Sequence, residues 1–329
     1  MLTKKSVDMI KLNLMAFIAF LTFSAVDPGF AATKFKQSYF VADGQRIYFE
    51  SAGQGSTIVF LAGGPGADPV YMKTLIVPFV KSHRCVLLHQ RGTGLSKDVP
   101  VNADFISIDK LIADLEQLRL VLNVGKIILV GHSWGGMLAM AYAGKYPDRI
   151  EKLILLDSGG CDISFFKAFN QRIMNNLTTE ERSELALIDR MMRNPDSLKI
   201  HFQAGNTSQA FAEAFKRLEA IIVNGYFYDR SNIRFFTQNM GEGINFQVNS
   251  LLLVGELSTQ KWDICDEFHK FRRPVLILEG SNDPVKSADV LHNIFPHSTM
   301  IYIPKSGHLI WYENFSLTKR LISAFVGGN

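Results

Sequence analysis

The sequence has little cysteine, no dense block of lysine or arginine, and no clustering of residues at metal-ligand spacing. Its three cysteines lie far apart among 329 residues, which excludes a disulfide framework and leaves room for one bridge in an oxidising compartment. Cys85 stands inside an apolar stretch and is interpreted as a small buried thiol. Charged residues make up 20% of the chain and the net charge is +4, so no nucleic-acid partner is expected.

Eight short apolar stretches predict β-strands, with helical patterns between most of them. The last five are rich in Val, Ile and Leu with little alternation, which is typical of strands covered on both faces of a parallel sheet. The first two are divided by Asp-Gly-Gln and predict an antiparallel hairpin. Strands alternating with helices predict the α/β class, with an eight-stranded, mostly parallel sheet covered by helices on both faces. The predicted strands are residues 38–42, 46–51, 57–63, 84–90, 126–131, 152–158, 274–280 and 299–304.

Residues 1–31 have the pattern of a signal peptide. A basic start precedes an apolar run over residues 12–26, which is too short to span a bilayer comfortably. Gly29 and Ala31 follow at the spacing that a signal peptidase prefers. We therefore expect an exported protein, periplasmic or secreted, with no stable membrane association after the leader is cleaved. An uncleaved N-terminal anchor is the alternative.

Residues 161–261 interrupt the alternation of strands and helices. They are helical in pattern and rich in Phe, Met and Arg, and they contain no convincing pair of strands. A helical cap domain inserted over the carboxyl edge of the sheet accounts for both their place in the chain and their composition. The predicted core then consists of residues 35–160 and 262–329.

A serine stands in a G-x-S-x-G pattern between a predicted strand and a predicted helix. A serine at such a sharp turn adopts a strained backbone conformation, and Gly131 and Gly135 are needed where a side chain would collide. The hydroxyl is exposed at the helix N-terminus, whose dipole favours a developing negative charge. Ser133 is therefore the predicted nucleophile, and Trp134 beside it is predicted to line the substrate pocket.

A nucleophilic serine needs a base, and the base needs an orienting acid. Asp283 comes just after one predicted strand and His308 just after the next, so both stand at the sheet edge that carries Ser133. The order Ser, Asp, His is the one expected on this type of fold. Asp157, at the end of the strand over residues 152–158, is the rival acid.

A glycine-rich stretch, "AGGPGA", follows the third predicted strand. Acyl transfer requires N–H donors for an oxyanion, and the backbone can supply them where side chains do not intrude. The N–H groups of Gly64 and Trp134 are the predicted donors. The stretch lacks the lysine and hydroxyl residue of a phosphate-binding loop, and neither a metal nor an organic cofactor is expected.

The stretches "AGGPG", "HQRGTGLS", "GHSWGG", "GSNDP" and "SGH" resemble the proline iminopeptidase family of α/β-hydrolases. The resemblance spans most of residues 45–160 and 272–325. The family typically has H-G-G-P-G in the first motif and D-Q-R-G-x-G-x-S in the second. Here Ala62 replaces the histidine and His89 replaces the aspartate, which puts the substrate in question but leaves the oxyanion glycines in place.

The resemblance implies the α/β-hydrolase fold and an enzyme that removes an N-terminal residue, often proline, from peptides. Cap-domain glutamates of that family hold the free α-amino group of the substrate. The segment "AFKRLEAIIVNGYFYDR" resembles the one that carries such a glutamate, which would make Glu219 the amine anchor. A solvated face of a cap helix is the alternative for Glu219, and Asp229 and Glu242 are weaker candidates for a second carboxylate.

The sequence thus predicts an exported serine hydrolase acting on small peptides with a free N-terminus through an acyl-enzyme. The first alternative is a carboxylesterase or lactonase with a neutral acyl substrate, motivated by Ala62 and an apolar cap. The second is a non-catalytic binding protein on a hydrolase scaffold. The sequence leaves the oligomeric state open.

Overall fold

The computed structural model describes residues 33–193, 209–257, 262–269 and 271–327. The predicted signal peptide lies outside the described residues. In the described part of the chain, no helix is both long and apolar enough to cross a membrane.

A single eight-stranded sheet forms the centre of the fold, in the order β1-β2-β4-β3-β5-β6-β7-β8. The pairs β1–β2 and β2–β4 are antiparallel and all the others are parallel. Asp43 and Gly44 form the β1–β2 turn with positive φ angles of 50° and 73°, as a tight two-residue hairpin requires. The predicted fold class is confirmed. The strands are β1 Lys36–Ala42, β2 Gln45–Ala52, β3 Thr57–Leu61, β4 Arg84–Leu88, β5 Ile127–His132, β6 Ile150–Leu156, β7 Val275–Gly280 and β8 Ser298–Ile303.

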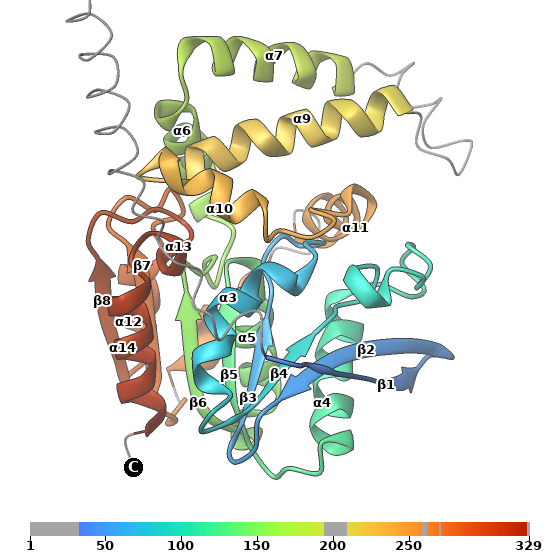
Figure 1. The fold of residues 1–329 in the computed structure, drawn as a ribbon, viewed down its shortest axis with the longest axis vertical. Helices are drawn as coiled ribbons and strands as arrows, with labels where there is room; N and C mark the ends of the chain where they lie inside the picture. The colour runs from blue at the N-terminus through green and yellow to red at the C-terminus, as the bar shows by residue number, and fades with distance from the viewer. Residues whose placement is uncertain (1–32, 194–208, 258–261, 270, 328–329) are drawn as a thin grey trace, which may run out of the picture. The chain divides into compact units, whose positions relative to one another are not determined.

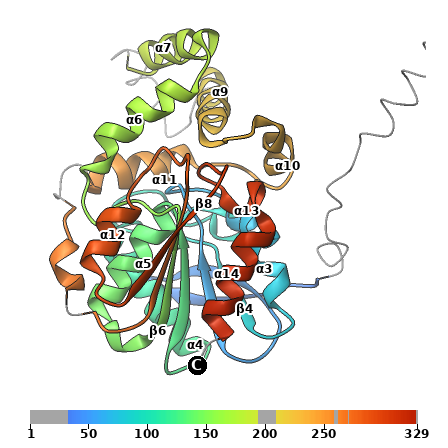
Figure 2. The same ribbon diagram turned by 90° about the vertical axis from the view of Figure 1, so that its left-hand side faces the viewer.

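Helices cover both faces of the sheet (Figure 2). Because successive side chains of a strand point to opposite faces, Val59 and Leu129 pack into the core beneath α4, α5 and α12, whereas Phe60 and Ile128 pack beneath α3 and α14. All four side chains are fully buried, which explains the uninterrupted apolar strands. The helices of this part are α3 Lys73–Ile76, α4 Ile108–Val121, α5 Trp134–Lys145, α12 Ala288–Ile294, α13 Ile310–Glu313 and α14 Phe315–Gly327.

The segment between β6 and β7 forms helices that lie beyond the carboxyl ends of the parallel strands (Figure 1). Part of this segment has a small apolar core of its own, in which Ile173 of α6 packs with Ile188 of α7 and Ile221 of α9. These helices therefore lie over the edge of the sheet from which the loops after the parallel strands emerge. They are α6 Phe165–Asn176, α7 Thr179–Arg193, α9 Gln209–Tyr226, α10 Ile233–Thr237 and α11 Phe246–Ser250.

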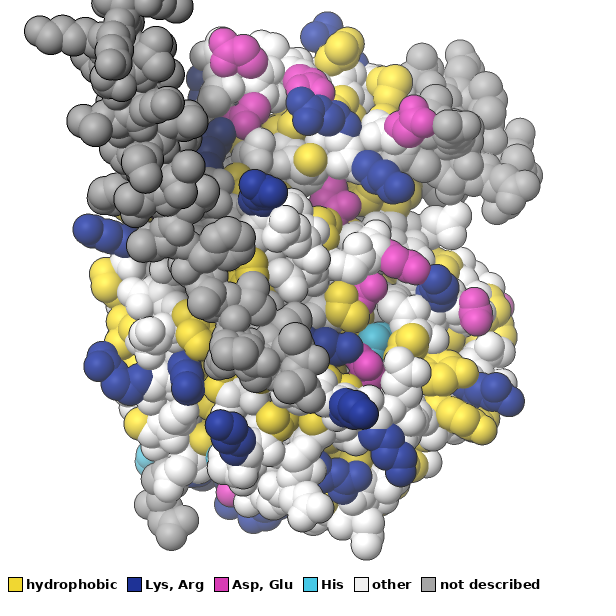
Figure 3. Space-filling view, viewed as in Figure 1, with side chains coloured by type: hydrophobic (Ala, Val, Ile, Leu, Met, Phe, Trp, Pro, Cys, Tyr) yellow, Lys and Arg dark blue, Asp and Glu magenta, His cyan; other side chains and the backbone are white. Residues whose placement is uncertain are grey.

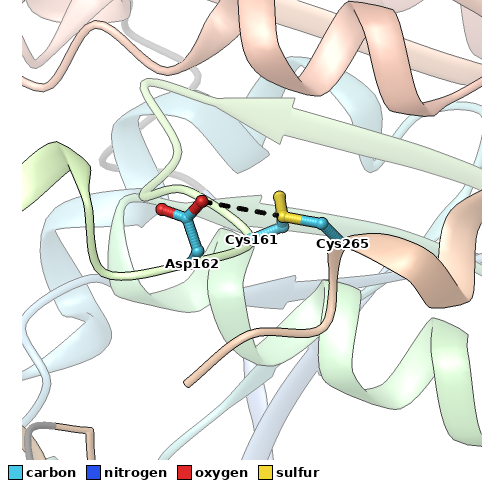
Figure 4. Close-up of side chains that lie close together, drawn as sticks. All are labelled: Cys161, Asp162 and Cys265. Atoms are coloured by element: carbon cyan, nitrogen blue, oxygen red, sulfur yellow. Dashed lines mark hydrogen bonds between the residues drawn. A yellow bond between two sulfur atoms is a disulfide. The ribbon is translucent and has the colours of Figure 1, made fainter. Parts of the chain in front are cut away.

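A disulfide joins the two ends of this helical insertion. Cys161, just after β6, is bonded to Cys265, just before β7, across 104 residues of chain (Figure 4). Beside it the Ile264 amide donates to the Cys161 carbonyl at 3.0 Å, and the indole of Trp262 donates to the Gly160 carbonyl at 3.3 Å. The pairing, which the sequence left open, ties both ends of the cap to one point of the core. Cys85 is a buried free thiol.

Candidate active site

Ser133 occupies the turn between β5 and α5. Its φ and ψ angles are 55° and −121°, a strained conformation for a residue with a side chain. A Cβ atom at Gly131 would collide with the carbonyl of Gly135, and one at Gly135 would collide with the carbonyl of Leu61. The two glycines thus allow the close chain approach that holds the serine in this turn.

His308 and Asp283 lie next to Ser133 in a continuous hydrogen-bonded series. The Nε2 atom of His308 is 2.9 Å from the Ser133 Oγ, and its Nδ1 atom is 2.9 Å from Asp283 Oδ1. Asp283 is held in turn, because its Oδ1 accepts a hydrogen bond from the Val285 amide at 2.9 Å. The loops after β5, β7 and β8 bring together these three residues, which the sequence places as far as 175 positions apart.

The rival acid, Asp157, is occupied elsewhere. It is fully buried, and its two carboxylate oxygens accept hydrogen bonds from the amides of Gly280 at 2.8 Å and Ile310 at 3.2 Å. Burial, together with the nearby charge of Asp283, raises the pKa of Asp157 well above its ordinary value. The geometry therefore pairs the His308 imidazole with Asp283 and gives Asp157 a role in joining the β7 and β8 loops.

The two predicted oxyanion donors, Gly64 and Trp134, line one cavity together with the serine. Trp134 is the first residue of α5, and Gly64 follows β3 with a positive φ of 115°. Among the described residues, no hydrogen bond uses the amide of either one. Gln90 connects the two loops, because its amide group donates to the Ala62 carbonyl and accepts from the Trp134 indole, both at 3.0 Å.

The substitution at position 89 has a local structural account. The His89 Nδ1 atom accepts a hydrogen bond from the Leu95 amide at 3.1 Å, so Nε2 carries the proton that points to Glu50 Oε2 at 3.2 Å. Burial by itself would raise the pKa of Glu50, but hydrogen bonds from His89 and from Lys73, 2.7 Å away, lower it to about 2. His89 thus braces the β4 loop through a buried carboxylate at some distance from the serine.

Two cavities meet at Ser133. The smaller one, of about 70 Å³, is bounded by the Gly63–Gly64 loop and by Tyr71 and Phe236. The larger one, of about 220 Å³, is lined mainly by apolar side chains, among them Phe165, Phe166, Phe169 and Phe215 from the cap and Trp134 from the core. Seven residues line both cavities: Gly64, Ser133, Glu219, Val223, Tyr226, Ile244 and His308.

Glu219 is the carboxylate that lines both cavities. It lies on α9, and its Oε1 accepts a hydrogen bond from the Ile244 amide at 3.1 Å. Burial among apolar side chains raises its pKa to about 7, only partly offset by that hydrogen bond. The side chain is partly buried and lines the same two cavities as Ser133.

The other two candidate carboxylates, which were the weaker ones, line neither cavity. Asp229 is exposed and caps a short helical turn by accepting from the Ser231 amide, and Glu242 pairs with Lys97 at 2.6 Å on the surface. The carboxylate that joins Glu219 in the smaller cavity is Asp68, which was not among the residues predicted from the sequence. The feature of the sequence that could have identified Asp68 is its position, four residues after Gly64 in the same loop.

The surface carries charges of both signs. On the face seen in Figure 3, lysine and arginine side chains are spread among apolar and acidic ones. This face therefore has no long band of charges of one sign, such as a nucleic-acid-binding surface carries. That nucleic acid is not a partner remains a prediction.

A protein-family model described as the alpha/beta hydrolase fold matches residues 56–315. Among curated proteins, proline iminopeptidase of Saccharolobus solfataricus is 24% identical over 86% of this chain and 89% of its own length. Cis-3-alkyl-4-alkyloxetan-2-one decarboxylase of Shewanella oneidensis is 35% identical, but the match covers only 38% of this chain and 39% of that protein.

Solved structures with the same fold include a proline iminopeptidase-related protein from Thermus thermophilus, with a TM-score of 0.66 at 18% identity over 89% of this chain and 98% of that one. A protein described as an N-acyl homoserine lactone degrading enzyme gives a TM-score of 0.65 at 21% identity, over 88% and 100%. At these identities the structures support the fold alone.

Proposed function

This chain belongs to the α/β-hydrolase family and is a proline iminopeptidase-like serine hydrolase, and we propose that it is an aminopeptidase releasing an N-terminal residue, preferably proline, from small peptides. One observation carries the proposal: a half-buried carboxylate, Glu219, lines both cavities at Ser133. A carboxylate in an apolar cavity is stabilised by a cationic partner, and the free α-amino group of a peptide is such a partner.

In the proposed mechanism, Ser133 attacks the substrate carbonyl while His308 Nε2 takes the hydroxyl proton. Asp283 holds the imidazole through Nδ1 and stabilises the imidazolium that forms. The amides of Gly64 and Trp134 donate to the oxyanion of the tetrahedral intermediate. His308 then returns the proton to the leaving amine, and the remaining acyl-enzyme is hydrolysed by a water that His308 activates in the same way.

The proposal is tested by comparing proline p-nitroanilide with N-acetylproline p-nitroanilide, using the full chain and p-nitrophenyl acetate as the activity control. Loss of a charge-assisted hydrogen bond to the amine is expected to lower kcat/KM by about 100-fold on the acetylated compound. Equal rates on both anilides would contradict the aminopeptidase. Turnover of the acetate alone would assign the chemistry to esters.

We predict that the preference for the free amine depends on pH through Glu219. Its pKa is raised to about 7, so below that pH the carboxyl is protonated and cannot pair with an ammonium group. The ratio of kcat/KM on proline p-nitroanilide to that on p-nitrophenyl acetate should therefore rise between pH 6 and pH 8. Both substrates use the same catalytic base, so the requirement on that base cancels from the ratio.

In Glu219→Gln this rise should disappear, and the ratio at pH 8 should fall about 10- to 100-fold, because the amide cannot ionise. Glu242→Gln is the matched control, since Glu242 is an exposed carboxylate outside both cavities. An unchanged pH profile in Glu219→Gln would remove Glu219 from the role of anchor.

The larger of the two cavities favours a second candidate function, that of a carboxylesterase or lactonase. Apart from Glu219, its lining is dominated by aromatic and aliphatic side chains, which suits a neutral acyl chain. The measurement compares wild-type rates on esters of medium-chain acids and on proline p-nitroanilide. Faster hydrolysis of the esters, with no benefit from a free amine, would favour this alternative.

Export of the protein is also proposed. The Cys161–Cys265 disulfide supports it, because such bonds form and persist in oxidising compartments. The N-terminal sequence of protein recovered from the periplasm or medium of a bacterial host would begin near residue 32 if the leader is cleaved there. Retention of the full chain in the cytoplasm would contradict export.

A further inference from the structure

Two buried polar side chains at the site have no part in the proposed chemistry. Tyr71 and His132 are each 4% exposed. The Tyr71 hydroxyl accepts a hydrogen bond from the Gly63 amide at 2.7 Å and lies 2.7 Å from His132 Nδ1. The Nε2 atom of His132 lies 2.8 Å from the carbonyl oxygen of His308. A continuous chain of hydrogen bonds thus runs from the loop that carries Gly64 to the backbone of the proposed catalytic base.

One arrangement of protons satisfies every group in this chain. The His308 carbonyl can only accept, so His132 Nε2 must carry a proton. Burial, together with the nearby His308, lowers the pKa of His132 well below its ordinary value, so the ring is neutral and Nδ1 accepts. Tyr71 therefore donates its proton to Nδ1 and accepts from the Gly63 amide. Each donor and acceptor in this series of hydrogen bonds then has a partner.

Packing leaves these groups little room to move. A Cβ atom built at Gly63 would lie 3.0 Å from His132 Nδ1, 3.1 Å from the Ser133 Cβ and 3.1 Å from the Tyr71 hydroxyl. The His132 ring meets Trp311 edge-on at 4.9 Å, and Tyr71 stacks on Trp311 at 6.0 Å. The segment after β3, the last residue of β5 and the segment after β8 are in this way held against one another.

We propose that Tyr71 and His132 are positioning residues, which fix the Gly63–Gly64 loop relative to His308 so that the oxyanion donor and the base face the same reacting carbonyl. Oxyanion donors stabilise a transition state only when they are held in place beforehand. A displacement of about 1 Å at such a site costs on the order of 100-fold in rate. The inference rests on the proposed catalytic roles of Ser133, Gly64 and His308, but it does not depend on whether the substrate is a peptide or an ester.

The test is Tyr71→Phe, assayed with p-nitrophenyl acetate. The substitution keeps the ring and removes the hydroxyl that links Gly63 to His132. We expect kcat to fall about 10- to 100-fold with KM within about threefold of wild type, because the donor is misplaced in the transition state rather than in the substrate complex. The affinity of phenylboronic acid, which forms a tetrahedral adduct on the serine, should fall by a similar factor.

His132→Asn is the second variant, since it keeps an acceptor for the Tyr71 hydroxyl but cannot reach the His308 carbonyl as the imidazole does. We again expect kcat to fall while KM stays close to that of wild type. Tyr142→Phe is the matched control. Tyr142 is also buried, and its hydroxyl donates a hydrogen bond of 2.7 Å to Glu116, but it lines neither cavity at Ser133. This variant should lower Tm without a selective loss of kcat or boronate affinity.

A Tyr71→Phe enzyme with kcat and boronate affinity within twofold of wild type would overturn the positioning role. Equal losses in Tyr71→Phe and Tyr142→Phe, in step with Tm, would overturn it too, since they would mark general destabilisation. A wild-type protein that neither hydrolyses the ester nor binds the boronic acid would instead overturn the catalytic assignment of Ser133, and the positioning role with it.

Discussion

Ser133→Ala is expected to lower kcat by about 10⁴-fold or more on any substrate that the wild-type protein turns over. The reason is that the acyl-enzyme cannot form without the Oγ atom, and the remaining rate comes only from binding and the oxyanion donors. The measurement is kcat on p-nitrophenyl acetate and on proline p-nitroanilide for both proteins. Unfolding temperatures close to that of wild type would show that the loss is chemical.

Labelling with a fluorophosphonate provides an independent check on the same residue. The wild-type protein should gain one adduct that maps to Ser133, and the alanine variant should gain none. A variant that keeps kcat within about 100-fold of wild type would mean that another residue is the nucleophile. His308→Ala should lose a similar factor, because the two side chains act as a unit through the 2.9 Å hydrogen bond.

Loss of the Cys161–Cys265 disulfide is expected to lower the free energy of unfolding by about 4 to 5 kcal/mol. The bond closes a long loop, with the two cysteines 104 positions apart, and in the chain-entropy model a loop of roughly 100 residues is worth that much. Since the shift in Tm per kcal/mol becomes smaller as the chain becomes longer, and is about 1.6 °C for a chain of this size, Tm should fall by roughly 7 °C. The variant Cys161→Ser with Cys265→Ser, or dithiothreitol added to wild type, gives the measurement.

Three observations separate this prediction from a general effect of reductant. Dithiothreitol should leave the double serine variant unchanged, and Cys85→Ser should respond to it as wild type does, because Cys85 is a free thiol. Thiol titration in guanidinium should find one reactive thiol in the oxidised protein and three after reduction. Three thiols before reduction would show that the bond does not form.

The strands could be predicted from the sequence because strand burial leaves a local signature. Stretches such as residues 126–131 and 274–280 are apolar without alternation, and both became strands buried on both faces. The turn at Ser133 was equally visible, since its two glycines flank the serine in the chain itself. In each case the physical requirement acts within a few residues.

The sequence predicted Asp283 as the acid but did not exclude its rival, and it left the pairing of the cysteines open. Asp157 and Asp283 both follow parallel strands, and only the fold shows that backbone amides hold the first while the second reaches the imidazole. The Cys161–Cys265 bond likewise depends on how the chain enters and leaves the cap. Sequence spacing carries no information on either contact.

The sequence by itself determined the α/β class and the nucleophile turn, because the first follows from local periodicity and the second from glycine at a sharp turn. The order of serine, acid and histidine along the chain agreed with the one expected on this type of fold. Only the tertiary structure shows which carboxylates line the cavities at Ser133: Asp68 joins the predicted Glu219, whereas Asp229 and Glu242 lie on the surface. It also decided that His132 joins two loops of the site. Such roles depend on side chains from distant segments meeting at one edge of the sheet, and only the packing of the whole chain sets those distances.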